Sequence, residues 1–325
     1  MPLTKGRVAK TCVMTLIALS SAVHAQNYPS KAVRIIIPFP PGGNTDIYAR
    51  PISAKMGELY GHQMVVDNRP GAGGSIGMQI AASQPADGYT LVWGSTSTHG
   101  VGPNVYKKLP YDPVADFEPV ILTVIAQNIL VVHPSVPAKN VKELIAIAKS
   151  KRGGLSFASS GNGTISHLAG ELFKNMTGAD IVHVPYKGSS PAMIDLLSGQ
   201  IDLMFDSLSS SLPQAKAGKL RALAVTGNKR FPGMKDLPTI SESGLKGFEV
   251  TTWLAIWAPA RTPKEIVSKL NTDINKILQQ PGILQLMADN GAEPGGGSPE
   301  RLGNHVKSEI AKWGALVKAA NIKIE

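Results

Sequence analysis

The loop that follows residues 33–37 carries the residue types best suited to bind an anion. Residues 33–37 read VRIII, a short β-branched run typical of a strand buried on both faces. Gly42 and Gly43 leave the backbone N–H groups open to a ligand. One of the next three residues is expected to cap a helix: Asn44, Thr45 or Asp46. Because a helix N-terminus offers free N–H groups and positive dipole potential, the loop is predicted to bind a carboxylate or another anion.

A second loop of the same kind occupies residues 186–192, after the strand-like residues 181–184. Gly188 gives access to the backbone, and Ser189 or Ser190 is expected to cap the next helix. Pro191 suits the first turn of that helix. Taken alone, this is also the pattern of an ordinary strand-to-helix turn. Since it occurs once in each half of the chain, we expect two helix N-termini to hold a carboxylate across a cleft.

Two further loops rich in hydroxyl groups follow strand-like segments, at residues 93–98 and 159–164. Asp206 ends another such segment and is expected at the same rim, although it could instead satisfy local N–H groups. In α/β sheets, ligands bind beyond the carboxyl ends of the strands. The candidate ligand-binding residues are Phe39, Pro41, Gly42, Gly43, Asn44, Thr45, Asp46, Ser95, Thr96, Ser97, Ser160, Gly161, Asn162, Thr164, Tyr186, Lys187, Gly188, Ser189, Ser190, Pro191, Ala192 and Asp206.

Residues 73–77, GGSIG, match the nucleophile-elbow pattern of serine esterases. Ser75 would be the nucleophile, and a partner histidine should come late in the chain. His305 is the only histidine after His183, and no obvious carboxylate orients it. A glycine-rich loop in which Ser75 caps a helix explains the same residues and is the favoured interpretation. A secreted esterase is kept as an alternative.

The sequence predicts no metal and no cofactor. No two of the seven histidines stand at a metal-ligand spacing, and no Walker A pattern occurs. Residues 71–76 lack the third glycine of the dinucleotide fingerprint. The 33 Lys and Arg side chains are scattered and aromatic residues are few, which argues against nucleic acid as a partner.

The first 25 residues resemble a secretory signal peptide. Lys5, Arg7 and Lys10 precede an apolar run over residues 13–19, and cleavage is expected after Ala25. Removal of this segment lowers the formal charge from +10 to +7, because it carries three basic residues and no acidic one. It also removes Cys12, the only cysteine. The mature protein is therefore expected to be soluble, exported and free of thiols.

Strand-like and helical segments alternate along the chain, which predicts an α/β fold with parallel sheets covered by helices. Seven short strands are expected, at residues 33–37, 64–67, 90–94, 155–159, 181–184, 202–205 and 220–225. Two longer apolar runs, residues 120–132 and 248–257, are expected to cross between two domains. We predict a signal peptide over residues 1–25, a discontinuous first lobe over 26–127 plus 248–325, and a second lobe over 128–247.

Several blocks make the chain resemble the extracytoplasmic solute receptors of the tripartite tricarboxylate transporter family, the Bug receptors. The blocks are PFPPGG (38–43), NRPGAGG (68–74), ADGYT (86–90), LPYDP (109–113), PYKGSSPA (185–192) and GKLRALAVTG (218–227). The resemblance implies a periplasmic binding-protein fold, type II-like, with two lobes joined by crossing strands. It also implies that residues 41–46 and 186–192 form jaws that hold a carboxylate through backbone groups, hydroxyls and water rather than an arginine.

One departure from the family pattern lies in residues 99–103, where Gly102 stands in place of the usual Asn. This departure predicts a changed ligand rim. The expected function is a monomeric, non-enzymatic periplasmic receptor that captures a small carboxylate and delivers it to membrane subunits of a tripartite tricarboxylate transporter. The alternative receptor role is an orphan sensor for a signalling system. The ligand classes left open are dicarboxylates, tricarboxylates, aromatic acids, nicotinate-like acids and acidic amino acids.

Overall fold

The computed structural model describes residues 28–319, so the expected signal peptide lies outside the described residues. The strands are β1 (Val33–Ile37), β2 (Met64–Asn68), β3 (Thr90–Ser95), β4 (Phe117–Val132), β5 (Leu155–Ser159), β6 (Ile181–Pro185), β7 (Leu203–Ser207), β8 (Arg221–Val225), β9 (Thr251–Pro259) and β10 (Ala292–Pro294). The α-helices are α2 (Asn44–Tyr60), α3 (Ser75–Ala82), α4 (Gly102–Val105), α5 (Val141–Ser150), α6 (Ile165–Thr177), α7 (Ser189–Leu197), α8 (Leu208–Lys216), α9 (Lys264–Leu278), α10 (Pro281–Asp289) and α11 (Pro299–Ala319). Short helical turns are η1 (Ala72–Gly74), η2 (Thr96–Val101) and η3 (Pro232–Met234).

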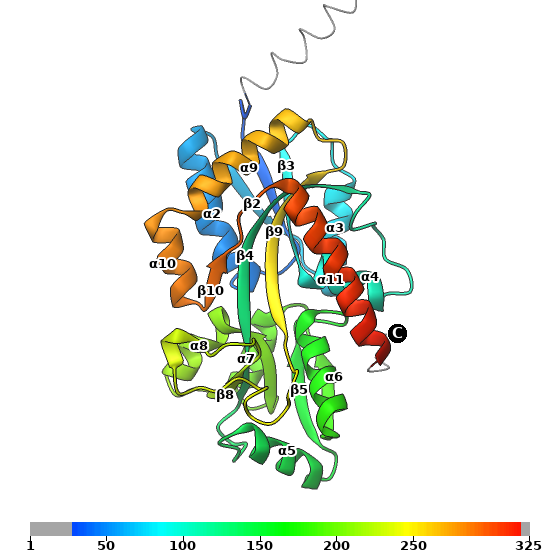
Figure 1. Cartoon of the computed structure of the whole chain (residues 1–325), viewed down its shortest axis with the longest axis vertical. Coiled ribbons are helices and arrows are strands. Elements are labelled where there is room, and N and C mark those ends of the chain that lie inside the picture. Colours follow the sequence, from blue (N-terminus) through cyan, green and yellow to red (C-terminus); the bar gives the residue numbers. More distant parts are fainter. Residues whose placement is uncertain (1–27, 320–325) are drawn as a thin grey trace, which may run out of the picture.

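The strands form one continuous mixed sheet in the order β2-β1-β3-β9-β4-β7-β5-β6, and β8 and β10 also pair with β4. Figure 1 shows an upper part, with β1–β3, α2, α3 and α9–α11, and a lower part, with β5–β8 and α5–α8. Within the upper part β1 pairs in parallel with β2 and β3, and within the lower part β5 pairs in parallel with β6 and β7. The predicted α/β class is therefore confirmed, as a mixed sheet flanked by helices.

The long strand β4 joins the two parts. Residues 117–127 of β4 pair antiparallel with β9 in the upper part, whereas residues 128–132 pair antiparallel with β7 in the lower part. The chain returns upward before β9, where the Val250 N–H bonds to the Thr226 carbonyl at 2.9 Å. Figure 1 shows β4 and β9 side by side along the long axis. The two apolar runs thus cross between the parts, and their antiparallel pairing makes the sheet mixed.

Apolar clusters support the two parts, and the cluster around Phe157 also reaches Val101 and Trp313 of the upper part. In the upper part, strand residues such as Ile35 and Leu91 pack with Leu270 and Ile274 of α9. In the lower part, two clusters cover the faces of the sheet, one around Phe157 and the other around Met204. Burial of β-branched and aromatic side chains on both faces is what an α/β sheet requires. In the described part of the chain, no helix has the length and apolar character needed to cross a membrane.

Candidate functional site

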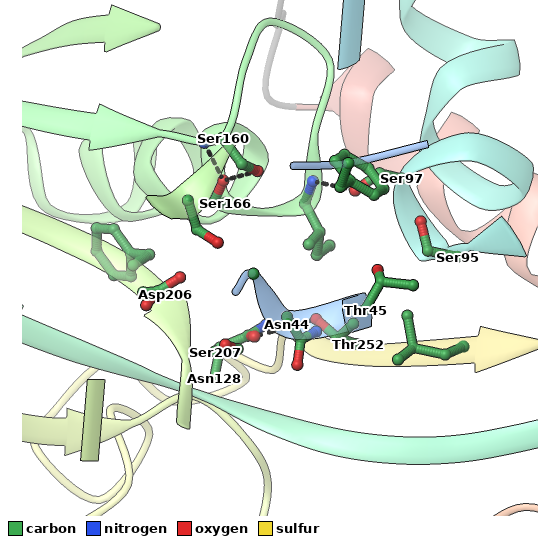
Figure 2. Close-up of a pocket in the computed structure, with 16 residues that line it drawn as sticks. Asn44, Thr45, Ser95, Ser97, Asn128, Ser160, Ser166, Asp206, Ser207 and Thr252 are labelled. Carbon is green, nitrogen blue, oxygen red and sulfur yellow. Dashed lines mark hydrogen bonds between the residues drawn. The ribbon is translucent and has the colours of Figure 1, made fainter. Parts of the chain in front are cut away.

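A cavity lies where the two parts of the sheet meet (Figure 2). Its walls come from the segments after β1 and β5, from the end of β3 and the turn after it, from the end of β7, from the start of α7, and from the central strands β4 and β9. Among the lining residues none is Lys, Arg or His, and the only carboxyl group belongs to Asp206. The lining residues are Phe39, Gly43, Asn44, Thr45, Ser95, Ser97, Asn128, Ser160, Ile165, Ser166, Ser189, Phe205, Asp206, Ser207, Thr252 and Leu254.

The N-terminus of α2 opens on this cavity. The N-cap is Gly43, and no side chain caps the helix, so the expected capping by residues 44–46 is wrong. Two of the residues expected to cap, Asn44 and Thr45, instead lie in the first turn and line the cavity. The first N–H groups of a helix have no partner within the helix, and glycine caps without covering them. The α2 N-terminus therefore keeps donors and positive dipole potential for a ligand.

Asp46 supports the loop before α2 rather than lining the cavity. Its Oδ2 accepts from the Gly42 N–H at 2.9 Å and from Arg50 Nε at 2.8 Å, and its Oδ1 accepts from Asn68 Nδ2 at 3.1 Å. The same Asn68 amide donates to the Phe39 carbonyl at 2.9 Å. Burial disfavours the charged form, but these hydrogen bonds outweigh it and lower the pKa of Asp46. The carboxylate thus fixes the loop in the shape that presents the helix N-terminus.

Two buried polar side chains at the cavity have unused hydrogen-bonding atoms. Ser95 is 3% exposed; its Oγ faces the Thr98 N–H in a capping box, and its O–H has no acceptor among the described residues. Asn128 is 4% exposed and its Nδ2 also has none, although its Oδ1 accepts from Thr252 Oγ1 at 3.0 Å. An unpaired buried polar atom is costly and calls for an explanation. Both residues line the cavity. A ligand whose oxygen atoms accept hydrogen bonds from them explains why these buried groups have no partner in the protein.

The loop between β5 and α6 forms another wall and joins the two parts of the molecule. Ser166 Oγ lies 3.0 Å from Ser160 Oγ and accepts from the Ser160 N–H at 3.0 Å. The Ile165 N–H of the lower part donates to Ser97 Oγ of the upper part at 3.0 Å. Figure 2 shows these contacts as dashed lines. Ser97, Ser160 and Ser166 are therefore positioned by each other and by the α6 N-terminus.

The loop before α7 faces the loop before α2 at close range. Gly188 is the N-cap, so the expected capping by Ser189 or Ser190 is wrong. Ser190 Oγ donates to the Pro41 carbonyl at 2.9 Å. A Cβ at Gly188, whose φ is +130°, would lie 2.3 Å from Pro40 Cγ. Glycine is required here by both the backbone conformation and this approach.

Asp206 stands at the end of β7 and is 4% exposed. Its Oδ2 accepts from Ser210 Oγ at 2.5 Å and from Ser211 Oγ at 2.8 Å, both on α8. Burial raises the pKa of Asp206, while these hydroxyl groups and the Ser207 N–H act in the opposite direction. The carboxyl group is therefore held as an acceptor at the side of the cavity formed by β7.

The structure brings nine of the predicted residues together around the cavity and leaves the others outside its lining. The nine are Phe39, Gly43, Asn44, Thr45, Ser95, Ser97, Ser160, Ser189 and Asp206. Of the others, Thr96 accepts from the Trp253 N–H, Tyr186 donates to Asp195, and Lys187 is exposed. The remainder outside the lining are Pro41, Gly42, Asp46, Gly161, Asn162, Thr164, Gly188, Ser190, Pro191 and Ala192.

Seven lining residues were not predicted from the sequence. They are Asn128, Ile165, Ser166, Phe205, Ser207, Thr252 and Leu254. The sequence signal for Asn128 is a polar residue within the long apolar run 120–132. Thr252 lies in the second crossing run and carries no comparable signal. Both reach the cavity because β4 and β9 are neighbours in the sheet. The sequence of either apolar run does not show which strand it pairs with.

Two other predicted features lie outside the cavity lining. Ser75 is the first residue of α3, 5% exposed, and the helix is capped by Gly74, so the expected capping by Ser75 is wrong. Its supposed partner His305 packs edge-on against Trp253. Gly102 begins α4, and a Cβ there would lie 3.1 Å from the Ser97 carbonyl. Neither Ser75 nor Gly102 lines the cavity.

The chain is similar to known solute-binding proteins over nearly its whole length. The model of the family "Tripartite tricarboxylate transporter family receptor" matches residues 48–322. BugT of Bordetella pertussis is 35% identical, covering 94% of each chain. An R. palustris protein solved with adipate is 42% identical at a TM-score of 0.89, covering 91% of this chain and 99% of that one.

Two further solved structures are similar to this chain over most of its length. The periplasmic binding protein BugD is 38% identical at a TM-score of 0.88, covering 92% of this chain and all of that one. MatC of Rhodopseudomonas palustris, solved with malate, is 33% identical at a TM-score of 0.86, covering 89% of this chain and all of that one. The chain belongs to the receptor family of the tripartite tricarboxylate transporters.

Proposed function

We propose that this protein is a periplasmic receptor that binds a small carboxylate in the cavity between its two parts. The observation that carries the proposal is the joint presence of an α2 N-terminus without a side-chain cap and the unpartnered atoms of Ser95 and Asn128. Helix N-terminal N–H groups and hydroxyls bind carboxylate oxygens without a cation. Relatives solved with adipate and with malate support a carboxylate as the ligand class.

We infer that the two parts act as lobes, over residues 26–127 plus 248–325 and over residues 128–247. The change of partners along β4 after Gln127 supports this division. Direct contacts then join the lobes at the cavity: Ser190 to Pro41, Ile165 to Ser97, and Ser209 Oγ to Asn44 Oδ1 at 3.0 Å. A ligand that touches both lobes shifts the population toward the closed state.

The remaining parts of the proposal concern export and partners. The protein is exported by a signal peptide cleaved after Ala25, acts as a monomer, and delivers its ligand to membrane subunits of a tripartite tricarboxylate transporter. It carries out no catalysis; the burial of Ser75 outside the cavity lining supports binding without an acyl-enzyme step. A fluorophosphonate probe that labels Ser75 would contradict this point.

The first test is native mass spectrometry of the purified protein, followed by calorimetry with mono-, di-, tri- and aromatic carboxylates. We expect one carboxylate to bind with one-to-one stoichiometry. In Ser95→Ala the affinity should fall about tenfold or more, because a hydrogen bond to a charged group contributes about 1.5–3 kcal/mol. Ser53→Ala is the matched control, since Ser53 is 2% exposed with an unpartnered Oγ but lies outside the cavity lining. Folded, ligand-free protein that binds no carboxylate would refute the proposal.

A further inference from the structure

Two walls of the cavity are joined behind its lining, at Trp253 on β9. Both sequence neighbours of Trp253 line the cavity but Trp253 does not, because successive strand residues point to opposite faces. The Trp253 N–H donates to Thr96 Oγ1 at 2.8 Å. Both sequence neighbours of Thr96, in turn, line the cavity. The bond between Trp253 and Thr96 therefore holds four lining residues: Ser95, Ser97, Thr252 and Leu254.

A buried carboxylate fixes the side chain of Trp253. Glu309 of α11 is 7% exposed, and its Oε2 accepts from Trp253 Nε1 at 2.9 Å. The same oxygen accepts from Trp313 Nε1, also at 2.9 Å. The other carboxylate oxygen lies 3.5 Å from Lys312 Nζ. An indole N–H can only donate, so Glu309 supplies the acceptor that both buried tryptophans need.

The same part of α11 also supports η2, the turn that begins with Thr96. A Cβ at Gly100 of η2 would lie 3.2 Å from Trp313 Cδ1 and 3.5 Å from Glu309 Cβ. The helix α11 packs against both η2 and α4 (Figure 1). Glu309 thus contacts β9 through Trp253 and lies close to η2 at Gly100, although it does not itself line the cavity.

We propose that Glu309 is a positioning residue of the ligand-binding site and acts through Trp253. This inference rests on the proposed function. With the indole bonded to Glu309, β9 and η2 are held in place before a ligand arrives, so binding does not carry the cost of ordering them. Without the acceptor, two buried N–H groups lose their partner, and the strand that carries Thr252 and Leu254 is no longer fixed from behind.

The experiment compares two substitutions of Glu309. Calorimetry with adipate, malate, citrate and benzoate is run on protein freed of copurified ligand by unfolding and refolding, and the variants are measured with whichever the wild type binds most tightly. Glu309→Leu, which removes the acceptor, should lower the affinity about tenfold. Glu309→Gln should stay within about threefold of the wild type, because its carbonyl oxygen can still accept from both indoles.

Asn271→Leu is the control for a general loss of stability. Asn271 Nδ2 donates to the Val120 and Gly297 carbonyls, each at 2.8 Å, and none of the three residues lines the cavity. This variant also loses two hydrogen bonds in the upper part, but it should keep the wild-type affinity. A thermal melt of each variant checks that it is folded.

A second pair of variants tests whether Glu309 acts through Trp253. Trp253→Phe removes the bond on the cavity side and should lower the affinity about tenfold. Trp257→Phe is the control, since Trp257 is also a buried residue of β9 outside the lining, and its Nε1 has no partner among residues 28–319. Adding Glu309→Leu to Trp253→Phe should cause little further loss of affinity, because the two substitutions remove the same bond.

The possible results separate the two proposals. Wild-type affinity in folded Glu309→Leu, or additive losses in the double variant, overturns the positioning role while carboxylate binding by the wild type stands. A Glu309→Gln variant as weak as Glu309→Leu also overturns it. If Glu309→Leu does not fold, equal affinities of Trp253→Phe and Trp257→Phe overturn it instead. If the folded, ligand-free wild type binds none of the four carboxylates, the proposed function fails for these ligands and the inference falls with it.

Discussion

Thr252 Oγ1 on β9 donates to Asn128 Oδ1 on β4 at 3.0 Å, while the Asn128 amino group has no partner among residues 28–319. Both residues line the cavity, and both are 4% exposed. A side-chain amide has an acceptor end and a donor end, so a bond to its oxygen decides which way its donors point. Thr252 is thus a positioning residue for the donor that Asn128 presents to a ligand.

Thr252→Val should weaken ligand binding about tenfold, because Asn128 loses the bond that orients it. Calorimetry with the best-bound carboxylate measures the change. The control is Thr123→Val, since Thr123 is buried on β4 and donates to the Leu254 carbonyl at 2.8 Å outside the cavity lining. Both variants should lose about 1–3 kcal/mol of the free energy of unfolding, but only Thr252→Val should lose affinity. Equal affinities in the two variants would contradict the role assigned to Thr252.

Gly188→Ala should abolish or strongly weaken ligand binding in a protein that still folds. The added Cβ would lie 2.3 Å from Pro40 Cγ, so the loops before α2 and α7 cannot reach their present distance. Gly188→Trp should have the same effect more completely. Gly244→Ala is the control, because its φ is +113° but no atom lies within 4 Å of the added Cβ. A folded Gly188→Trp variant with wild-type affinity would show that this approach is not needed for binding.

Tyr106→Phe should shift the ligand-free protein toward a more open state. The Tyr106 hydroxyl donates to the Ala72 carbonyl in the upper part and to the Asn162 carbonyl in the lower part. Loss of a typical hydrogen bond costs about 0.5–1.5 kcal/mol, so affinity should fall about two- to tenfold. Small-angle X-ray scattering should show a larger radius of gyration. Tyr89→Phe, which removes a bond to Ser30 within the upper part, should leave both quantities unchanged.

Acid should destabilise the loop between β5 and α6 through two stacked histidines. The rings of His167 and His183 lie 3.8 Å apart between centroids; the Gly163 N–H donates to His167 Nδ1 at 3.3 Å, and Ser159 Oγ lies 2.6 Å from His183 Nε2. Burial lowers the pKa of His167 to about 3 and the pKa of His183 to about 4. Each neutral ring thus stabilises the fold above the unfolded-state pKa of about 6.5.

The free energy of unfolding should therefore fall as the pH drops from about 6.5 toward 4, because in this range the two histidines bind protons in the unfolded chain but not in the folded one. Urea titrations between pH 7 and pH 4 measure this slope. His183→Gln should make the slope shallower, because one of the two rings no longer titrates. His62→Gln, outside the pair, is the comparison. A His183→Gln slope as steep as that of the wild type would rule out the pair as a source of acid sensitivity.

Local sequence patterns predict the elements of this fold well, because each element depends mainly on neighbouring residues. The run VRIII becomes β1 over the predicted residues, and residues 155–159 become β5. The two long apolar runs become β4 and β9, which carry the chain between the parts. The helix caps were harder to predict, because small polar residues and glycine compete for the same position. At α2, α3 and α7 the cap is glycine, and the polar residue lies in the first turn.

By itself, the sequence determined the α/β class, the glycine-rich loops before α2 and α7, and the family to which the chain belongs. Only the tertiary structure decided which polar side chains share the cavity. Gln127 and Asn128 are adjacent in the sequence, but only Asn128 lines the cavity, because successive residues of a strand point to opposite faces. The hydrogen bond of Asn128 with Thr252, and its place opposite Ser207 in the sheet, depend on strands more than 70 residues apart in the chain. Those contacts form only when β4, β7 and β9 come together in one sheet.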